Sequence, residues 1–235
     1  MLYFAHRMNQ IEQGIPVSVL VPIKNEAANL ARCLGSVQWA NEVLLVDSQS
    51  TDGSIEIAEK HGAKLVQFHF NGAWPKKKNW ALENLQFRNE WVFILDADEV
   101  LPPEAETEFA AAIANAGNIA GYWINRRFMF LGRWLRHAYY PNWNLRLFRH
   151  KLGRYEQITA APTDSGDNEV HEHVLINGST AKLQVEIDHY AFPSIDVFVE
   201  NITAIRIGKR AWQRMRAFAR DQNESAASRS IDGAN

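Results

Sequence analysis

Short apolar runs alternate with helix-like segments through the first hundred residues, and this alternation constrains the fold more than any other feature. The runs are rich in β-branched and aromatic residues, which is typical of buried strands. Strands separated by single helices favour a parallel, doubly wound sheet. The expected strands are 17–21, 42–46, 64–68 and 91–95, and the expected helices are 27–37, 54–61, 75–85 and a segment from Pro103 to about Ala114.

The pattern changes after residue 120, where arginine and aromatic residues become frequent. Residues 144–148 and 182–187 predict strands, and 164–168 predict a polar loop. Residues 195 to about 220 predict a long helix with one apolar face. Residues 225–235 are small and polar, which predicts a disordered tail. Neither a repeat nor a second domain is visible, so we expect one domain over residues 1–224.

Composition is that of an ordinary globular protein, with 235 residues, 46% hydrophobic and 22% charged. The single cysteine, Cys33, excludes an intramolecular disulfide and fits a reducing compartment. No apolar stretch approaches the ~20 residues that span a bilayer. Residues 1–13 lack the apolar core of a signal peptide. We therefore expect a cytoplasmic location.

Charge is unevenly distributed along the chain. Residues 1–120 contain 9 basic and 15 acidic residues, whereas residues 121–235 contain 16 and 12. Residues 122–154 hold eight basic and nine aromatic residues and no acidic ones. Such a stretch suits single-stranded nucleic acid, an anionic lipid surface or a phosphorylated glycan, although the aromatic residues can equally fill a core. A pI near 6.5 argues against nucleic acid, and the basic terminal helix favours peripheral contact with the inner face of the cytoplasmic membrane.

Asp96-Ala97-Asp98 directly follow the fourth expected strand. Open α/β sheets bind ligands at the carboxyl ends of their strands. Two carboxylates one residue apart can hold a divalent cation and leave room for phosphate oxygens. A lone triplet of this kind also occurs as a solvated acidic turn. Because Glu26 and Asp47 follow the first and second strands, we expect all four carboxylates to share one crevice.

Together these motifs resemble glycosyltransferase family 2, whose members have a Rossmann-like nucleotide-sugar domain. Pro22-Ile23-Lys24-Asn25-Glu26 is similar to the first-strand motif of that family, and residues 47–54 are similar to the second-strand motif. Asp96-Ala97-Asp98 resembles its metal motif. Val170-His171-Glu172, after Arg146-Leu147-Phe148, is similar to the bacterial lipopolysaccharide-core β-glucosyltransferases. The resemblance is dense in the first half and patchy over residues 120–175.

The resemblance implies a GT-A-type fold, with a mostly parallel sheet flanked by helices and a long C-terminal helix. Residues 15–115 would bind the nucleotide sugar, and residues 116–224 would meet the acceptor. The implied reaction is an inverting, metal-dependent transfer of a hexose, expected to be glucose, from a UDP-sugar to a lipopolysaccharide-core or other lipid-linked glycan, with Mg²⁺ or Mn²⁺ as cofactor. A sugar-1-phosphate nucleotidyltransferase and a non-catalytic nucleotide- or glycan-binding module are the alternatives.

The resemblance also implies roles for individual residues. Asp47 would accept a hydrogen bond from the base, and Glu26 and Asp96 would hold the base or the ribose. Asp98 would bind the metal ion, which stabilises the departing nucleotide, and Lys78 would pair with a phosphate. Pro22 and Asn25 complete the implied donor site.

Some of these residues have a structural alternative. Helix capping is an equal possibility for Glu26 and for Asp52. The remaining lysines of the cluster, Lys76 and Lys77, are expected to form a solvated face.

Inverting transfer needs a base that deprotonates the acceptor hydroxyl. Many family members use an acidic residue late in the domain, often in a Glu-Asp pair, but here a His-Glu pair stands in its place. We expect Glu172 to be the base and His171 to orient it, bind a phosphate or complete the metal shell. A solvent-facing strand is the alternative, and a zinc site at His171 and His173 is disfavoured. Asp188 and His189 are the reserve candidates.

Overall fold

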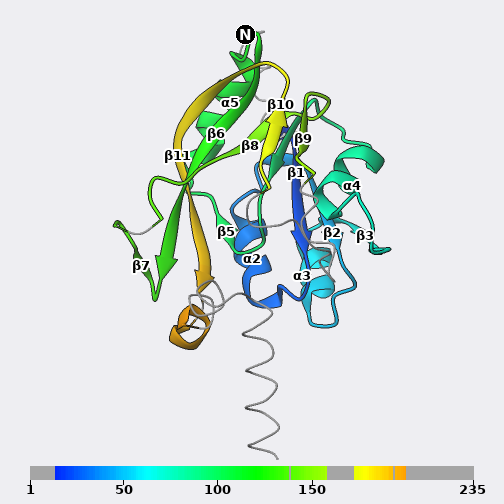
Figure 1. Cartoon of the computed structure of the whole chain (residues 1–235), viewed down its shortest axis with the longest axis vertical. Helices are drawn as coiled ribbons and strands as arrows, with labels where there is room; N and C mark the ends of the chain where they lie inside the picture. The colour runs from blue at the N-terminus through cyan, green and yellow to red at the C-terminus, as the bar shows by residue number, and fades with distance from the viewer. Residues whose placement is uncertain (1–13, 138, 158–171, 193, 200–235) are drawn as a thin grey trace, which may run out of the picture. The chain divides into compact units, whose positions relative to one another are not determined.

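The computed structural model describes residues 14–137, 139–157, 172–192 and 194–199 (Figure 1). It divides into two compact units, of which the first comprises residues 1–129 and 134–190 and the second residues 130–133 and 191–235. The candidate site lies in the first unit. One domain over residues 1–224 stays a prediction, and the expected loop at 164–168 and tail at 225–235 lie outside the described residues.

The first unit contains the expected alternation of strands and helices. Its strands β1 (Ile15–Ile23), β2 (Ala40–Asp47), β3 (Lys64–Gln67) and β4 (Trp91–Ile94) alternate with α2 (Ala27–Gly35), α3 (Ser54–Lys60) and α4 (Lys77–Asn84), and β5 (Glu99–Val100) and α5 (Ala105–Ala114) follow. Each strand and helix expected over this part of the chain is confirmed, with ends shifted by a few residues at most.

A mixed sheet forms the centre, with the strand order β3-β2-β1-β4-β8-β6-β11-β5. The pairs among β1 to β4 are parallel, whereas β8 pairs antiparallel with both β4 and β6. The later strands are β6 (Ile119–Phe130), β7 (Arg133–Trp134), β8 (Trp143–Arg149) and β11 (Ser179–Phe192), with β9 (Gly153–Tyr155) and β10 (Val174–Ile176) as a separate pair. The described residues between β6 and β8 contain no helix, and parallel neighbours need such a crossover. The predicted α/β fold is therefore confirmed, with an antiparallel second half.

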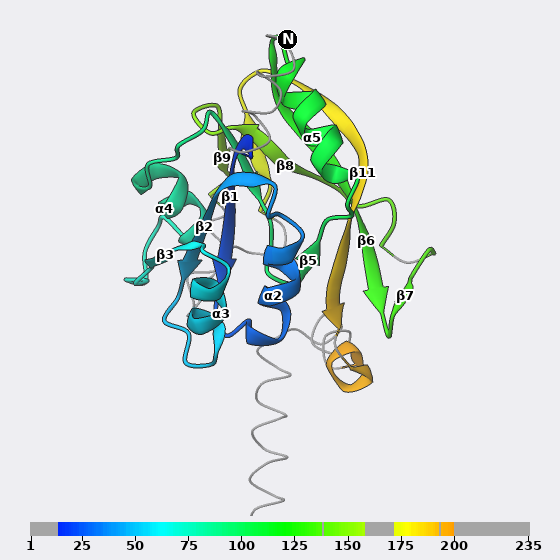
Figure 2. The ribbon, with the colours of Figure 1, turned by 180° about the vertical axis from the view of Figure 1, so that it is seen from behind.

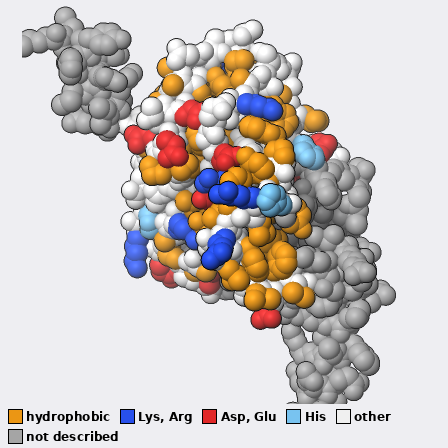
Figure 3. Space-filling view, turned by 90° about the vertical axis from the view of Figure 1, so that its left-hand side faces the viewer, with side chains coloured by type: hydrophobic (Ala, Val, Ile, Leu, Met, Phe, Trp, Pro, Cys, Tyr) orange, Lys and Arg blue, Asp and Glu red, His pale blue; other side chains and the backbone are white. Residues whose placement is uncertain are grey.

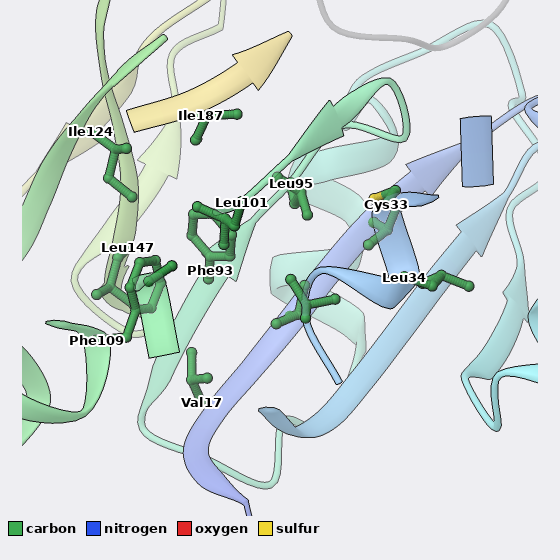
Figure 4. Close-up of a cluster of buried hydrophobic side chains, with 14 of the residues drawn as sticks. Val17, Cys33, Leu34, Phe93, Leu95, Leu101, Phe109, Ile124, Leu147 and Ile187 are labelled. Carbon is green, nitrogen blue, oxygen red and sulfur yellow. The ribbon is translucent and has the colours of Figure 1, made fainter. Parts of the chain in front are cut away.

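Both faces of the sheet are packed. Along β1, Val17, Val19 and Val21 contact the cluster that includes residues of α2, α3 and α5, whereas Leu20 belongs to the cluster under α4. Figure 2 shows α2, α3 and α5 on the side of the sheet that faces the viewer. Figure 4 shows part of their core, where Phe109 lies among the strand residues. The strand period of two residues explains this division.

The second unit contains a short helical segment at the start of the expected C-terminal helix. Residues 195–199 are helical, and the rest of the expected helix lies outside the described residues. The rings of Phe130 and Phe198 lie 4.8 Å apart, and those of Phe192 and Phe198 lie 5.1 Å apart. Among the described residues there is no helix with the length and apolar character of a membrane span.

Candidate active site at the carboxyl ends of β1 and β4

Asp96-Ala97-Asp98, referred to below as the D-x-D, form a tight turn between β4 and β5. The N–H of Glu99 donates to the carbonyl oxygen of Asp96 at 2.9 Å and closes the turn. The side chain of Glu99 reaches back, and its Oε2 accepts the N–H of Asp96 at 2.9 Å. These two bonds fix the backbone of the turn and hold Asp96 and Asp98 at the end of β4.

Asp96 is held between two cations. Its Oδ1 lies 2.8 Å from Nζ of Lys78, and its Oδ2 lies 2.8 Å from Nη2 of Arg146. Burial alone would raise the pKa of Asp96, but the charges and hydrogen bonds of Arg146 and Lys78 hold that pKa well below its usual range. Asp96 is therefore an ionised acceptor with a fixed orientation.

Glu99 connects the same site to two arginines. It is fully buried, and its Oε1 accepts from Nη2 of Arg146 and Nη1 of Arg126, both at 3.1 Å. Arg146 is 5% exposed, and its Nη1 has no hydrogen-bond partner among the described residues. Sequence reasoning missed Glu99 and Arg126. The sequence did contain a signal for Glu99, which is an acid directly after the D-x-D. A carboxylate buried at that position needs a cationic partner such as an arginine.

His189 joins Asp98 through the pairing of β5 with β11. The register sets His189 opposite Glu99, and the N–H of Tyr190 donates to the carbonyl oxygen of Asp98 at 2.9 Å. Nε2 of His189 consequently lies 3.0 Å from Oδ2 of Asp98. Sequence reasoning held His189 only as a reserve candidate for the base, whereas the structure brings it to the expected metal residue.

The Asp98–His189 pair fits a divalent cation. Nε2 and Oδ2 lie at hydrogen-bond distance, and neighbouring ligands of an octahedral ion at 2.0–2.1 Å are also about 3 Å apart, so a bound cation would replace the shared proton. Nδ1 of His189 is buried and has no partner among the described residues. No cluster of three or more candidate protein ligands occurs in the described part of the chain. The fit is thus to an ion that takes its other ligands from phosphate and water, as Mg²⁺ commonly does.

Glu26 lies near the same carboxylates. Burial raises its pKa, a hydrogen bond from Asn29 opposes this rise, and the charges of Asp98, Asp96 and Asp52 add to it. Glu26 makes no side-chain capping bond to α2. Its Oε2 instead accepts Nδ2 of Asn29 at 3.0 Å. The structure thus brings Glu26, Asp96 and Asp98 together, as their positions at strand ends predict.

Asp52 is the residue that caps helices. Its Oδ2 accepts the N–H of Ala27, and its Oδ1 accepts the N–H of Ser54, both at 3.0 Å. Ala27 and Ser54 are the first residues of α2 and α3. One carboxylate therefore accepts a hydrogen bond from the backbone N–H at the start of each of two helices.

Asp47 is fully buried at the end of β2. The N–H of Ser50 lies 3.1 Å from both of its carboxylate oxygens, and Nε2 of Gln67 donates to Oδ2 at 2.8 Å. Contact with a base therefore requires the Gln67 amide to move aside. Asn25 supports this loop, because its Oδ1 accepts the N–H of Thr51 at 2.8 Å.

The expected solvated face of Lys76 and Lys77 is wrong. The two residues are 8% and 2% exposed. Nζ of Lys77 donates to the carbonyl oxygen of Ile23 at 3.0 Å, where β1 ends. Nζ of Lys76 lies 2.7 Å from Oε1 of Glu172. The lysine ammonium groups at the start of α4 thus bond to buried oxygen atoms that are remote in sequence. These oxygens take the place of solvent as hydrogen-bond acceptors.

Glu172, the expected base, is buried in that ion pair with Lys76. His171 lies outside the described residues. The next residue, His173, is exposed, and its Nδ1 lies 3.1 Å from Oε1 of Glu156. Pro22, the remaining residue of the implied donor site, lies in β1 opposite Val46 of β2.

Four parallel strands with acidic residues at their carboxyl edge give this half of the sheet a Rossmann-like arrangement. Over residues 18–168 the chain matches the profile described as glycosyl transferase family 2, and it belongs to that family. The resemblance noted from the motifs is thereby confirmed.

Individual relatives agree with this assignment. The chain is 30% identical over 182 residues to the lipopolysaccharide core biosynthesis glycosyltransferase LpsC of Rhizobium meliloti, covering 70% of the chain and 59% of that protein. It is 32% identical over 193 residues to the uncharacterized glycosyltransferase RC0292 of Rickettsia conorii, covering 78% and 65%. The chain thus spans 59–65% of the length of these relatives. A crystal structure of TarS 1-349 from S. aureus in complex with UDP-GlcNAc is similar with a TM-score of 0.45 and 23% identity, over 58% of this chain and 46% of that one.

Proposed function

We propose that the chain catalyses an inverting, metal-dependent transfer of a hexose from a nucleotide sugar to a lipopolysaccharide-core or other lipid-linked glycan. The observation that carries this proposal is the Asp98–His189 pair beside Asp96, at the edge where parallel sheets bind nucleotides. Membership of family 2 and the similarity to LpsC support the reaction class and the acceptor class. The UDP moiety and glucose follow from the motif resemblance.

The donor is held by residues at the ends of β1, β2 and β4. Asp96 accepts from a ribose or base hydroxyl or N–H, because Lys78 and Arg146 keep it ionised and fixed. Lys78, whose side chain is 14% exposed, reaches the diphosphate by turning from Asp96. Asp47 contacts the base once Gln67 has moved. Glu26 lies close enough to Asp96 and Asp98 for their charges to raise its pKa.

Asp98 and His189 would hold Mg²⁺ or Mn²⁺. Such an ion, when bound, supplies stabilisation for the negative charge that develops on the departing diphosphate. The carboxylate and the imidazole would supply two ligands to the ion, and the donor would supply others. A bound cation would also offset the repulsion between Glu26 and the aspartates, because burial and the charges of these aspartates raise the pKa of Glu26.

Glu172 is proposed to be the base that deprotonates the acceptor hydroxyl. In the structure its Oε1 lies 2.7 Å from Nζ of Lys76, so this ion pair occupies one carboxylate oxygen. Passage of the Lys76 ammonium group to a donor phosphate would remove this contact from the carboxylate, which would couple the environment of the base to donor binding.

Peripheral contact with an anionic membrane from the cytoplasmic side is part of the proposal. Within residues 122–154 several arginines have partners inside the molecule. Arg126, Arg127, Arg146 and Arg149 pair with acids from other segments. Membrane contact therefore relies mainly on the basic residues of the C-terminal helix, which lie outside the described residues.

A panel of nucleotide sugars tests the proposed function. Purified protein is incubated with each donor and Mn²⁺ without acceptor, and slow release of the nucleoside diphosphate is measured with and without a chelator. We expect release from one or a few donors, and we expect the chelator to stop it. Binding of a nucleotide sugar with no release and no transfer to any glycan would indicate a non-catalytic module instead.

A further inference from the structure

A row of aromatic rings leads from the Asp98–His189 pair to the surface. The rings of His189 and Phe128 meet edge to face with centroids 4.7 Å apart, and those of Phe128 and Tyr139 lie 5.0 Å apart. Phe128 is 9% exposed, whereas Tyr139 is 49% exposed. The guanidinium of Arg126, which pairs with Glu99, also lies 5.4 Å from the centroid of Phe128. Tyr139 is therefore an exposed ring separated from the candidate active site by one buried ring.

The backbone of Tyr139 is strained. Its φ of 59° lies in the left-handed region, which aromatic residues rarely adopt. Strain of this kind is concentrated at binding and catalytic sites. Leu131 shares the exposure, at 58%, and the left-handed backbone, with φ 48°. Because Leu131 has no part in the row of rings, it offers a matched comparison.

Planar polar side chains are clustered on the same strands. Oε1 of Glu186 accepts from the hydroxyl of Tyr140 at 2.8 Å and from Nδ2 of Asn125 at 2.6 Å. Oδ1 of Asn125 accepts the N–H of Asn142 at 2.7 Å. These groups lie on β6, β11 and the segment that leads into β8, and Tyr140 follows the exposed ring directly in sequence.

This combination suits a sugar ring. A pyranose has an apolar face of C–H groups, which packs on an aromatic ring, and an edge of hydroxyl groups, which bonds to amide and carboxylate groups. Lys or Arg side chains and His side chains lie between hydrophobic ones on the face of the molecule seen in Figure 3. A flat apolar partner would use only the aromatic ring, and a purely anionic partner would use only cationic groups, so neither would use the ring together with the amide and carboxylate groups.

The position of the row indicates which sugar it would meet. β6 and β11 are separated from β1 and β2 by β4 and β8 in the sheet (Figure 1). The donor base is proposed to bind at β1 and β2, whereas the metal residue, Asp98, contacts His189 and Tyr190 of β11. A saccharide on Tyr139 would therefore approach the metal residue from the side opposite the base, which is the side of the acceptor.

We propose that Tyr139, with the Asn125–Tyr140–Glu186 network, forms a subsite for a sugar ring of the acceptor glycan. The inference rests on the proposed transferase function and adds to it the place and chemistry of acceptor binding. Tyr139 supplies the stacking face, and Tyr140 and Glu186, the more exposed members of the network, supply hydrogen bonds to the ring hydroxyls, whereas the buried Asn125 holds Glu186 in place. Tyr139 acts in binding and takes no part in the chemistry of transfer.

The test uses a deacylated lipopolysaccharide-core oligosaccharide as probe, with its dissociation constant measured by NMR titration. Three variants are compared with the unaltered chain: Tyr139→Asn, Tyr139→Phe and the control Leu131→Asn. Asn adopts the left-handed conformation readily, so Tyr139→Asn removes the ring without adding strain. Donor hydrolysis without acceptor and the melting temperature are measured for every protein, because neither depends on the proposed subsite.

We expect Tyr139→Asn to weaken probe binding by about tenfold, the loss of one good ring contact. Tyr139→Phe and Leu131→Asn should bind the probe normally, and donor hydrolysis should be the same in all four proteins. Equal probe binding by Tyr139→Asn and the unaltered chain would overturn the subsite, as would failure of the unaltered chain to bind the probe while it hydrolyses donor. Absence of donor hydrolysis in every protein would instead contradict the proposed function.

Discussion

Asp98 and His189 are 91 positions apart in the chain, yet their Oδ2 and Nε2 atoms lie 3.0 Å apart. The antiparallel pairing of β5 with β11 produces this contact, because it sets His189 opposite Glu99, the residue next to Asp98. A strand-end acid from the parallel half of the sheet thereby meets a histidine from the antiparallel half. Neither half contains the pair by itself.

Asp98→Ala should abolish metal-dependent transfer and leave the fold intact. The carboxylate lies in the turn beyond β4 and contributes to the site rather than to the core. The measurement is turnover at saturating donor and metal, with the melting temperature as a check on folding. Glu83→Ala, at an exposed acid of α4, is the matched control. Undiminished turnover in Asp98→Ala would remove the D-x-D from the metal site.

Asp96→Asn should make stability less dependent on pH. The pKa of folded Asp96 is well below the 3.8 of the free side chain. Its ion pairs therefore stabilise the fold fully above pH 3.8, and this stabilisation is lost as the pH falls from there through the folded pKa. Urea unfolding should show a deficit of ~1–3 kcal/mol for Asp96→Asn near neutral pH. The deficit should shrink below pH 3.8, and a constant deficit would mean that the charge of Asp96 does not matter.

Glu172→Gln should preserve donor and metal binding but stop transfer to the acceptor. The amide keeps the shape of the side chain but cannot take a proton, and general-base catalysis is typically worth ~10²–10⁴-fold. Turnover with acceptor is compared with donor hydrolysis in its absence. His171→Ala is the companion variant, with a loss expected in metal affinity or in alignment.

The ion pair offers a second way to examine Glu172. Lys76→Met removes the partner at 2.7 Å and should weaken donor binding if that ammonium passes to a phosphate. Near-normal transfer by Glu172→Gln, combined with an inactive His171→Ala, would show that the base is misassigned. A purely structural pair would lower the melting temperature in both pair variants and leave the ratio of transfer to hydrolysis unchanged.

Asp47→Ala should weaken binding of the free nucleoside diphosphate by ~1.5–3 kcal/mol, the value of a hydrogen bond to a charged acceptor. Calorimetry measures this change. Gln67→Ala is informative because Gln67 now occupies Oδ2 of Asp47 at 2.8 Å. Its removal should leave nucleotide affinity unchanged or improve it. An unchanged dissociation constant in Asp47→Ala would exclude this residue from the site.

Local sequence pattern predicted the first half of the fold. The runs from Val17 to Val21 and from Trp91 to Leu95 carry a clear strand signal, and Asp52 was recognisable as a cap. The antiparallel half was visible only in part. β6 extends over 12 residues, but strand pairing is non-local, and arginine and aromatic residues obscure its alternation.

The site was predictable only to the extent that local motifs define it. Asp96 and Asp98 follow a strand and were found, whereas the partners that determine their chemistry, Arg146 and His189, come from β8 and β11. Lys77 was misplaced for the same reason. Its acceptor is the carbonyl oxygen of Ile23, 54 positions away, and no pattern of lysines indicates such a contact.

Coordination of Mn²⁺ by His189 tests the central claim most directly. Electron spin echo envelope modulation of Mn²⁺, bound to the protein together with UDP, detects a histidine nitrogen attached to the metal ion. The proposed site predicts a nitrogen signal in the unaltered chain, loss of that signal with retained binding in His189→Ala, and loss of bound Mn²⁺ in Asp98→Ala. Tight binding of Mn²⁺ and UDP with no nitrogen signal, or with a signal that persists in His189→Ala, would contradict it.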